Sequence, residues 1–160
     1  MLSPDDKQGL RRALGAFATG VTIVTASDPE NGEPVGFTAN SFTSVSLEPP
    51  LLLVCLAHTA ASYAIFCATG SFAVNVLAAN QEETAKIFAT RGADKFATVA
   101  WQPGGTGAPL IEGTLAQFDC AIYERMTAGD HDVLIGRVAA YSRREGRALV
   151  YHSGSFAALG

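Results

Sequence analysis

The sequence predicts a mainly β fold, an antiparallel β-barrel with peripheral helices. Segments with strand composition outnumber segments with helical periodicity. Most strand segments follow one another through short turns, which favours antiparallel pairing over repeated βαβ crossovers. A set of about seven strands of this length suits a small closed barrel.

The chain has 160 residues and a mass of 16.7 kDa, which predicts a single domain over residues 1–160. Hydrophobic residues make up 48% and charged residues 16%, so the composition excludes a disordered chain. So low a charged fraction also favours a surface that is partly covered by a subunit interface.

The N-terminal segment predicts an amphipathic helix. Ser3 is the expected N-cap and Pro4 the first helical residue. One apolar stripe follows at four- and three-residue spacing and ends near Gly20. The stripe consists of Leu10, Leu14 and Phe17.

A β-hairpin is expected next. Residues 21–25 alternate apolar and hydroxyl side chains, which is typical of a strand. Residues 28–32 have turn composition, and a second strand is predicted from about Val35. Residues 38–46 are rich in hydroxyls, and residues 51–56 predict a buried strand.

Short helices alternate with a strand in the middle of the chain. Thr59 is the expected cap of a helix that runs through Cys67, and residues 71–77 predict a strand. Residues 80–83 resemble a capping box that opens a second helix. Residues 103–109, rich in glycine and proline, predict an exposed loop.

Three further strands are predicted towards the C-terminus, at residues 113–126, 132–142 and 148–151. Gly129 and Asp130 form the expected turn between the first two, and residues 143–146 form the turn before the last.

Charge and hydropathy exclude several classes of protein. The net charge is −4 and the pI about 5.3, which disfavours nucleic-acid binding because no basic face is available. The longest apolar run, residues 51–57, is far shorter than the about 20 residues of a membrane helix, so no membrane association is expected. The three histidines lie in separate segments, and no metal site is expected.

A cytoplasmic location is expected. Cys55, Cys67 and Cys120 are scattered and odd in number, which favours reduced thiols over a disulfide framework. Residues 1–12 are polar and lack the apolar core of a signal peptide.

The hydroxyl-rich segment is the first candidate binding site. Residues 38–46 carry a hydroxyl or amide at six of nine positions, which suits a phosphate or ribityl chain in a neutral protein. If the segment is extended, four of its polar side chains share one face. An edge strand whose hydroxyls satisfy the local backbone explains the composition equally well.

Two further candidates are a turn histidine and a cation beside an aromatic ring. Residues 129–131, Gly-Asp-His, deliver His131 at the head of a strand, where it either meets a cofactor or is solvated. Lys95 and Phe96 follow the second helix and are equally typical of a solvated helix end.

Taken together and in this order, these segments resemble the flavin reductase family, the small reductase components of two-component flavin monooxygenases. The resemblance runs from about Leu10 to Leu159. The segments that carry it are residues 20–25, 36–51, 72–77, 94–96, 128–131 and 135–138.

The resemblance implies a split β-barrel of the FMN-binding type that works as a homodimer. It implies FMN or FAD as the flavin and NADH or NADPH as the hydride donor. A flavin-dependent monooxygenase is the implied transient partner, to which reduced flavin is released. Hydride transfer between two rings needs neither a metal nor an acid–base pair.

The resemblance also implies the site residues, position by position. His131 is the implied catalytic residue, which orients the nicotinamide rather than donating a proton. The residues implied to bind cofactor are Thr38, Ala39, Asn40, Ser41, Ser44, Val45, Ser46, Cys55, Leu56, Ser62, Lys95, Phe96, Asp130, His131 and Tyr151. Within residues 55–62, the resemblance implies that backbone amides and the Ser62 hydroxyl lie near the flavin phosphate.

Two departures and two alternatives stay open. Residues 152–156 lack the basic side chains that such proteins often carry there, and Phe37 stands where a smaller residue is usual. A non-catalytic FMN carrier or sensor on the same barrel is one alternative. An oxidase that retains its flavin tightly is the other, and the pattern does not separate FMN from FAD.

Overall fold

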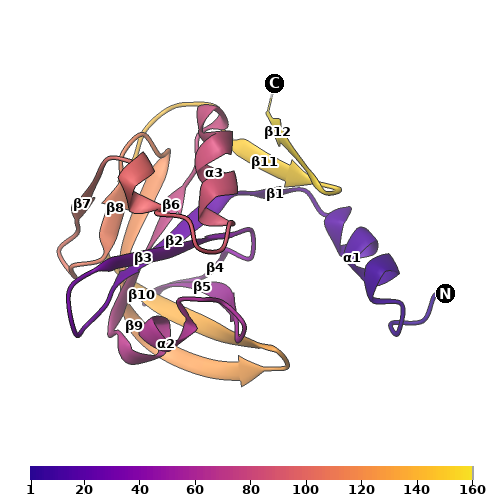
Figure 1. The fold of residues 1–160 in the computed structure, drawn as a ribbon, viewed down its shortest axis with the longest axis horizontal. Coiled ribbons are helices and arrows are strands. Elements are labelled where there is room, and N and C mark those ends of the chain that lie inside the picture. The colour runs from indigo at the N-terminus through magenta and orange to yellow at the C-terminus, as the bar shows by residue number, and fades with distance from the viewer. Residues whose placement is uncertain (160) are drawn as a thin grey trace.

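The computed structural model describes residues 1–159, and its centre is a curled antiparallel sheet of seven strands in the order β3-β2-β6-β9-β10-β5-β4 (Figure 1). These strands are β2 (Thr22–Ser27), β3 (Pro34–Ala39), β4 (Thr43–Leu47), β5 (Pro50–Ala57), β6 (Ser71–Val76), β9 (Ala116–Ala128) and β10 (His131–Arg143).

The two edges of this sheet are joined by the chain itself. β3 and β4 lie at opposite ends of the strand order, yet only residues 40–42 separate them in sequence. Ser41 lies in this link, and its Oγ accepts a hydrogen bond of 2.9 Å from the N–H of Cys55 on β5. The sheet therefore closes into a barrel that is split between β3 and β4, and the expected fold class is confirmed.

Apolar side chains fill both sides of the sheet, which explains why β2 is almost wholly buried. One cluster of buried residues contains Val24, Ala26, Ala39, Leu52, Val54, Leu56, Phe66, Phe72, Val74, Cys120 and Leu134. A second contains Val21, Ile23, Leu77, Ala85, Phe88, Ile111 and Leu149. Asn75 is buried between strands, and its side chain bonds Ile23, Thr25 and Ile111.

Smaller elements surround the barrel. Two short sheets are formed by β1 (Thr19–Gly20) with β11 (Leu149–His152) and β12 (Ser155–Ala158), and by β7 (Trp101–Pro103) with β8 (Pro109–Ile111). The helices are α1 (Lys7–Gly15), α2 (Tyr63–Ala68) and α3 (Glu82–Phe88), with short 3₁₀ turns η1 (Ala79–Gln81) and η2 (Phe96–Thr98).

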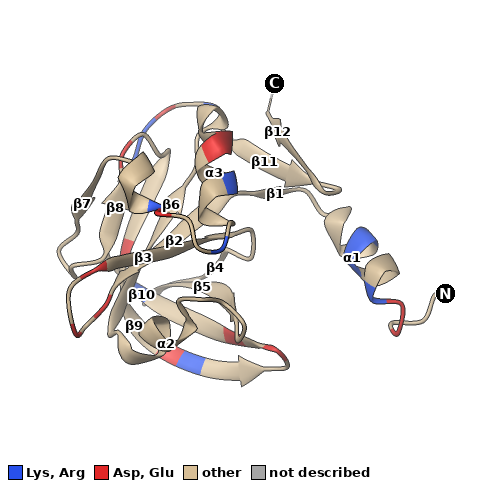
Figure 2. Ribbon diagram, in the orientation of Figure 1, with Lys and Arg blue, Asp and Glu red and all other residues tan. Residues whose placement is uncertain are grey.

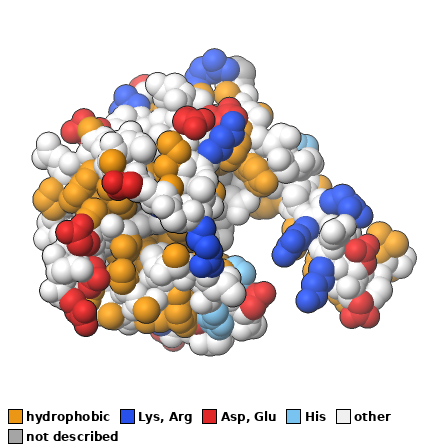
Figure 3. Space-filling view, viewed as in Figure 1, with side chains coloured by type: hydrophobic (Ala, Val, Ile, Leu, Met, Phe, Trp, Pro, Cys, Tyr) orange, Lys and Arg blue, Asp and Glu red, His pale blue; other side chains and the backbone are white. Residues whose placement is uncertain are grey.

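Helix α1 projects from the barrel and buries none of its residues (Figure 1). In the space-filling view it stands clear of the rest of the molecule (Figure 3). The apolar stripe is consequently open to solvent, with Leu10 44%, Leu14 67% and Phe17 80% exposed.

The boundaries predicted for this helix were wrong at both ends. Asp6, not Ser3, is the N-cap, because its Oδ1 accepts a 2.9 Å hydrogen bond from the N–H of Gly9. The Ser3 hydroxyl instead accepts from the N–H of Asp5. The helix ends at Gly15 rather than near Gly20, since the chain there is already pairing as β1.

The middle helices also begin later than expected. Thr59 is not a cap, because the chain first makes two tight turns, from Ala57 to Ala60 and from Ala60 to Tyr63, before α2 starts. Helix α3 is preceded by η1, and the Gln81 side chain accepts from the N–H of Ala78.

The predicted loop at residues 103–109 is shorter than expected. β7 pairs with β8, and Ala108 is fully buried, because Trp101 and Ile111 anchor this hairpin in the second cluster. The next strand starts at Ala116 rather than Gly113, which has a φ of 79° that ends the extended run. Strand β12 was not predicted.

Two hairpins are confirmed. β2 pairs with β3, and β9 pairs with β10 through the two-residue turn Gly129-Asp130. Gly129 has a φ of 65°, which this kind of turn requires.

Residues 38–46 do not form one continuous strand with a common face. The chain leaves β3 at Ala39 and enters β4 at Thr43, on the other edge of the sheet.

Charged side chains of both signs are scattered over the barrel, whereas the charged side chains of α1 are all basic (Figure 2). Among residues 1–159, every helix is too short or too polar to cross a bilayer.

Candidate functional site

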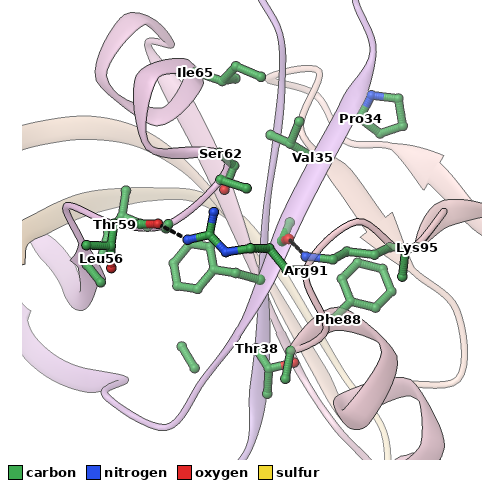
Figure 4. Close-up of a pocket in the computed structure, with 18 of the residues that line it drawn as sticks. Pro34, Val35, Thr38, Leu56, Thr59, Ser62, Ile65, Phe88, Arg91 and Lys95 are labelled. Atoms are coloured by element: carbon green, nitrogen blue, oxygen red, sulfur yellow. Dashed lines mark hydrogen bonds between the residues drawn. The ribbon is translucent and has the colours of Figure 1, made fainter.

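The main cavity is an open cleft of about 770 Å³ (Figure 4). This volume lies within the range of about 300–1,000 Å³ that is usual for small-molecule sites. Its walls are residues 33–41 of β3 and the link that follows, residues 55–57 of β5, residues 59–62 and 65, residues 88–89 and 91–96, and His131.

The topology explains why these segments meet. The end of β5 pairs with the start of β10, which places His131 opposite Ala57. β3 is the edge strand beneath α3, and the Thr38 hydroxyl donates a 2.6 Å hydrogen bond to the carbonyl of Ala85 on that helix. The cleft thus lies between edge strand β3 and the end of β5, with residues of α2 and α3 in its walls.

Two cations, Arg91 and Lys95, reach into the cleft from the segment after α3 (Figure 4). The Arg91 guanidinium donates to the carbonyl of Thr59 across the cleft. The Lys95 ammonium donates a 3.2 Å hydrogen bond to the carbonyl of Gly36. Partial burial lowers the pKa of Lys95, and the nearby Arg91 charge lowers it further. Both cations favour an anion in the cleft.

Opposite these cations, residues 59–62 offer free backbone donors. No hydrogen bond within residues 1–159 engages the N–H of Thr59, Ala61 or Ser62. Unpaired N–H groups in a turn form a concave site for an anion. The Ser62 hydroxyl lies beside them and makes no capping bond to α2. This group of residues, 59–62, is called the amide loop below.

His131 stands at one end of the cleft and is held by its neighbour. Its Nδ1 lies 2.6 Å from Oδ1 of Asp130, and the side chain is 44% exposed. This hydrogen bond, and the charge of the ring, lower the pKa of Asp130. Because a carboxylate only accepts, Nδ1 carries the proton, which fixes the ring and leaves Nε2 available.

The structure brings ten of the predicted site residues together around the cleft. They are Thr38, Ala39, Asn40, Ser41, Cys55, Leu56, Ser62, Lys95, Phe96 and His131. The other five do not line it: Ser44, Val45 and Ser46 lie on edge strand β4, Asp130 supports His131 from outside, and Tyr151 lies on β11 beside the second cluster.

Several of the predicted hydroxyls are occupied by the fold. Thr38 bonds the carbonyl of Ala85, and Ser41 bonds both backbone groups of Cys55. As the alternative explanation expected, these two hydroxyls satisfy backbone groups, but the groups belong to distant segments of the chain and not to the local backbone. Phe37 packs edge-on against Phe66, with ring centroids 5.2 Å apart.

Sequence reasoning missed Arg91. It follows α3 in a segment without periodicity, and nothing in the pattern shows that it reaches Thr59. The amide loop acts through its backbone, so its Thr-Ala-Ala-Ser sequence by itself carries little signal. Only the family resemblance pointed to the backbone amides of residues 55–62.

The arrangement can hold a phosphorylated molecule and place an imidazole beside it. The cleft has apolar side chains, from Val35 and Ile65 among others, next to its cations and free amides. Within residues 1–159, no group of three or more His, Cys, Asp or Glu side chains is placed to hold a metal ion.

Comparison with known proteins gives a family match over residues 14–160, to the model described as "Flavin reductase like domain". A probable flavin reductase of Rhizobium meliloti (strain 1021) is 48% identical over 151 residues, which cover 94% of this chain and 48% of the relative. The chain thus spans about half the length of that relative. An NADH-dependent FAD reductase of Streptomyces globisporus is 44% identical over 164 residues, covering 98% of this chain and 87% of that protein.

Solved structures of similar proteins superpose on nearly the whole of this chain. The NADH:FAD oxidoreductase SgcE6 of Streptomyces globisporus C-1027, in complex with NAD and FAD fragments, superposes with a TM-score of 0.94. It is 42% identical, and the match covers 100% of this chain and 96% of that one. BorF, the flavin reductase component of a bacterial two-component tryptophan halogenase, has a TM-score of 0.88 and 45% identity, with 96% and 98% covered.

Proposed function

The chain belongs to the flavin reductase family, and from this premise we propose that it is an NAD(P)H:flavin oxidoreductase that uses FMN or FAD. It takes a hydride from NADH or NADPH and passes it to the flavin. The observation that carries the proposal is the cleft, in which two cations and three free amides face one another beside His131.

The amide loop and Arg91 are the proposed site for the phosphate of the flavin. A phosphate accepts several hydrogen bonds at once, and the loop offers three unpaired N–H groups and the Ser62 hydroxyl. Arg91 adds a guanidinium, whose planar donors suit a phosphate. Lys95 and Phe96 close the same end, while residues 38–41 line the flavin between phosphate and ring.

A bound flavin supplies the acceptor for the hydride. The role of the protein is to hold the nicotinamide and flavin rings in contact, which by itself removes much of the barrier to hydride transfer. His131 orients the nicotinamide, since it lines the cleft and its ring is oriented by Asp130. The remaining predicted residues, Ser44, Val45, Ser46 and Tyr151, stay in the proposal as outer contacts of the flavin or dinucleotide.

The same proposal includes a homodimer. The apolar stripe of α1 is uncovered, and Val45 and Leu47 on edge strand β4 are 46% and 92% exposed. A second copy of the chain offers an apolar surface of the same kind, so two copies cover both. Residues 1–160 form one domain in this proposal.

A flavin-dependent monooxygenase is the proposed transient partner, because several relatives are reductase components of such systems. One is the reductase subunit HsaB of Rhodococcus jostii (strain RHA1), 43% identical over 155 residues. The reduced thiols of Cys55, Cys67 and Cys120 support a cytoplasmic location.

The test is NADH oxidation by the purified protein, with and without added FMN, FAD or riboflavin. A rate that rises and saturates with free flavin is expected, and it ranks the flavins. A yellow protein that bleaches once and ignores added flavin identifies a carrier or a tight-flavin enzyme instead. If neither NADH nor NADPH is oxidised under any condition, the reductase proposal is refuted.

A further inference from the structure

A buried carboxylate lies directly behind the cleft. Asp132 follows His131 on β10, and its side chain is only 8% exposed. Three side chains bond it: His58 Nε2 lies 2.8 Å from Oδ1, the Thr127 hydroxyl donates to Oδ1 at 3.0 Å, and the Tyr63 hydroxyl donates to Oδ2 at 2.8 Å. Because the carboxylate can only accept, His58 carries its proton on Nε2.

Two of these donors flank the amide loop. His58 immediately precedes Thr59, and Tyr63 immediately follows Ser62. Asp132 therefore fastens both ends of the amide loop to one carboxylate. The two rings also pack edge to face, with centroids 5.2 Å apart.

The loop is tied to the His131 turn as well. The N–H of His58 donates a 3.0 Å hydrogen bond to the carbonyl of Asp130. Asp132 and His131 are consecutive on one strand, where successive side chains point to opposite faces. His131 lines the cleft, and Asp132 holds the loop from the other side of the strand.

Stability alone gives a poor account of this cluster. A buried carboxylate costs free energy unless several donors satisfy it, and apolar side chains of the same size usually pack at no loss. Three donors satisfy it here, and two of them, His58 and Tyr63, are the residues that bound the free amides. The cluster therefore holds the amide loop, which lines the cleft, in one conformation.

We propose that Asp132 is a positioning residue, which holds the amide loop in the conformation that binds the flavin phosphate and sets its place relative to His131. This inference rests on the proposed function. Arg91 holds the loop only at one carbonyl, that of Thr59. Without the Asp132 carboxylate, both ends of the loop lose their side-chain anchor, and only backbone hydrogen bonds and the Arg91 contact hold the loop in place.

The test compares FMN, which carries the phosphate, with riboflavin, which lacks it. In the parent protein FMN should bind more tightly than riboflavin in a titration of flavin fluorescence. Asp132→Asn should weaken FMN binding by about 10- to 100-fold, the loss expected for hydrogen bonds to a charged group, and should change riboflavin binding by less than about three-fold.

The chain offers a matched control in Asp119, a second buried carboxylate. It is 3% exposed and holds Thr106 through the backbone N–H and the hydroxyl, away from the cleft. Asp119→Asn should leave the preference for FMN over riboflavin unchanged even if it lowers Tm. Tyr63→Phe removes one anchor and keeps the carboxylate, so it should give a smaller loss of the same preference should Asp132→Asn fail to fold.

Equal losses for FMN and riboflavin, or an unchanged preference for FMN, would overturn the inference. NADH oxidation by the parent on the same preparation separates this result from a failure of the proposed function. A parent that reduces flavin while Asp132→Asn and Tyr63→Phe keep the full FMN preference refutes the positioning role alone. A parent that binds neither flavin refutes the proposed function.

Discussion

At the scale of single residues, His131 is the group in the cleft whose ring is oriented by a neighbouring carboxylate. Its Nδ1 is bound to Asp130, and this contact favours one orientation of the ring. A fixed ring beside the proposed nicotinamide position contributes through orientation, and small misplacements in such a site lower a rate strongly.

His131→Ala should lower kcat with NADH by about ten-fold or more, because the dinucleotide loses the group that orients it. The Kd for FMN should change by less than about three-fold, since the phosphate contacts lie elsewhere in the cleft. Steady-state kinetics and a flavin titration measure the two effects separately. Equal turnover in mutant and parent would remove His131 from the mechanism.

Arg91 gives a second prediction at this scale. Arg91→Gln should weaken FMN binding by about ten-fold or more and leave riboflavin binding nearly unchanged, because only FMN carries the anion. Lys86→Gln is the matched control, since Lys86 lies on α3 and pairs with Glu82 at the surface. A loss of the same size in both variants would show that overall charge, not a local contact, attracts the flavin.

Residue types alone indicated the part of the candidate site in which side chains carry the chemistry, and the resemblance was needed for the part formed by the backbone. Lys95 and His131 were singled out by residue type, and both line the cleft. The amide loop contributes N–H groups that every residue possesses, so composition cannot single it out and only the resemblance implied it. Asp132 was missed altogether, because one aspartate after Gly-Asp-His gives no sign of its burial.

At the scale of elements, strands and turns followed from sequence more closely than helix ends did. β2, β5 and β6 lie where apolar or alternating runs place them. The predicted start of α1 was wrong because Ser3, Asp5 and Asp6 are all residue types that favour the N-cap position. The hydrogen bond from the N–H of Gly9 to Asp6 identifies Asp6 as the N-cap.

Gly136 on β10 gives a prediction for the packing of the sheet. A Cβ at this position would lie 2.6 Å from Cζ of Phe72 and 2.9 Å from Cβ of Cys120, both fully buried. Gly136→Ala should therefore lower the free energy of unfolding by about 1–3 kcal/mol. Tm should fall by roughly 2–4 °C for each kcal/mol.

Gly70 supplies the comparison. No atom lies within 4 Å of a Cβ built there, so Gly70→Ala should change the free energy of unfolding by less than about 0.5 kcal/mol. Thermal unfolding followed by circular dichroism measures both variants. If Gly136→Ala and Gly70→Ala have the same Tm, Phe72 and Cys120 must be able to move aside, and the packing argument fails.

At the scale of the whole molecule, the uncovered face of α1 should decide the oligomeric state. Leu14→Glu combined with Phe17→Glu places two charges on a stripe that the proposed dimer buries. Each lost apolar contact is worth about 1.5–3 kcal/mol, so dimer affinity should fall by at least about 100-fold. Light scattering should then report the monomer mass of 16.7 kDa.

Gln8→Glu adds charge to the opposite side of the same helix and should leave the dimer intact. Position 8 is about 160° from position 10 around an ideal helix. A double variant that keeps the mass of the parent would exclude α1 from the interface. Dissociation of both variants would instead indicate a general charge effect on α1.

The order of the strands also determines when this protein can first bind its ligand during synthesis. Residues 33–96 contain every residue that lines the cleft except His131. Yet β5 and β6 are joined in the sheet only through β9 and β10, which emerge later. A nascent chain that ends before β10 thus contains nearly all the residues that line the cleft, but it lacks the strand that joins β5 to the rest of the sheet. Long-range pairing of this kind folds slowly, so affinity for flavin should appear late and abruptly as the chain is completed.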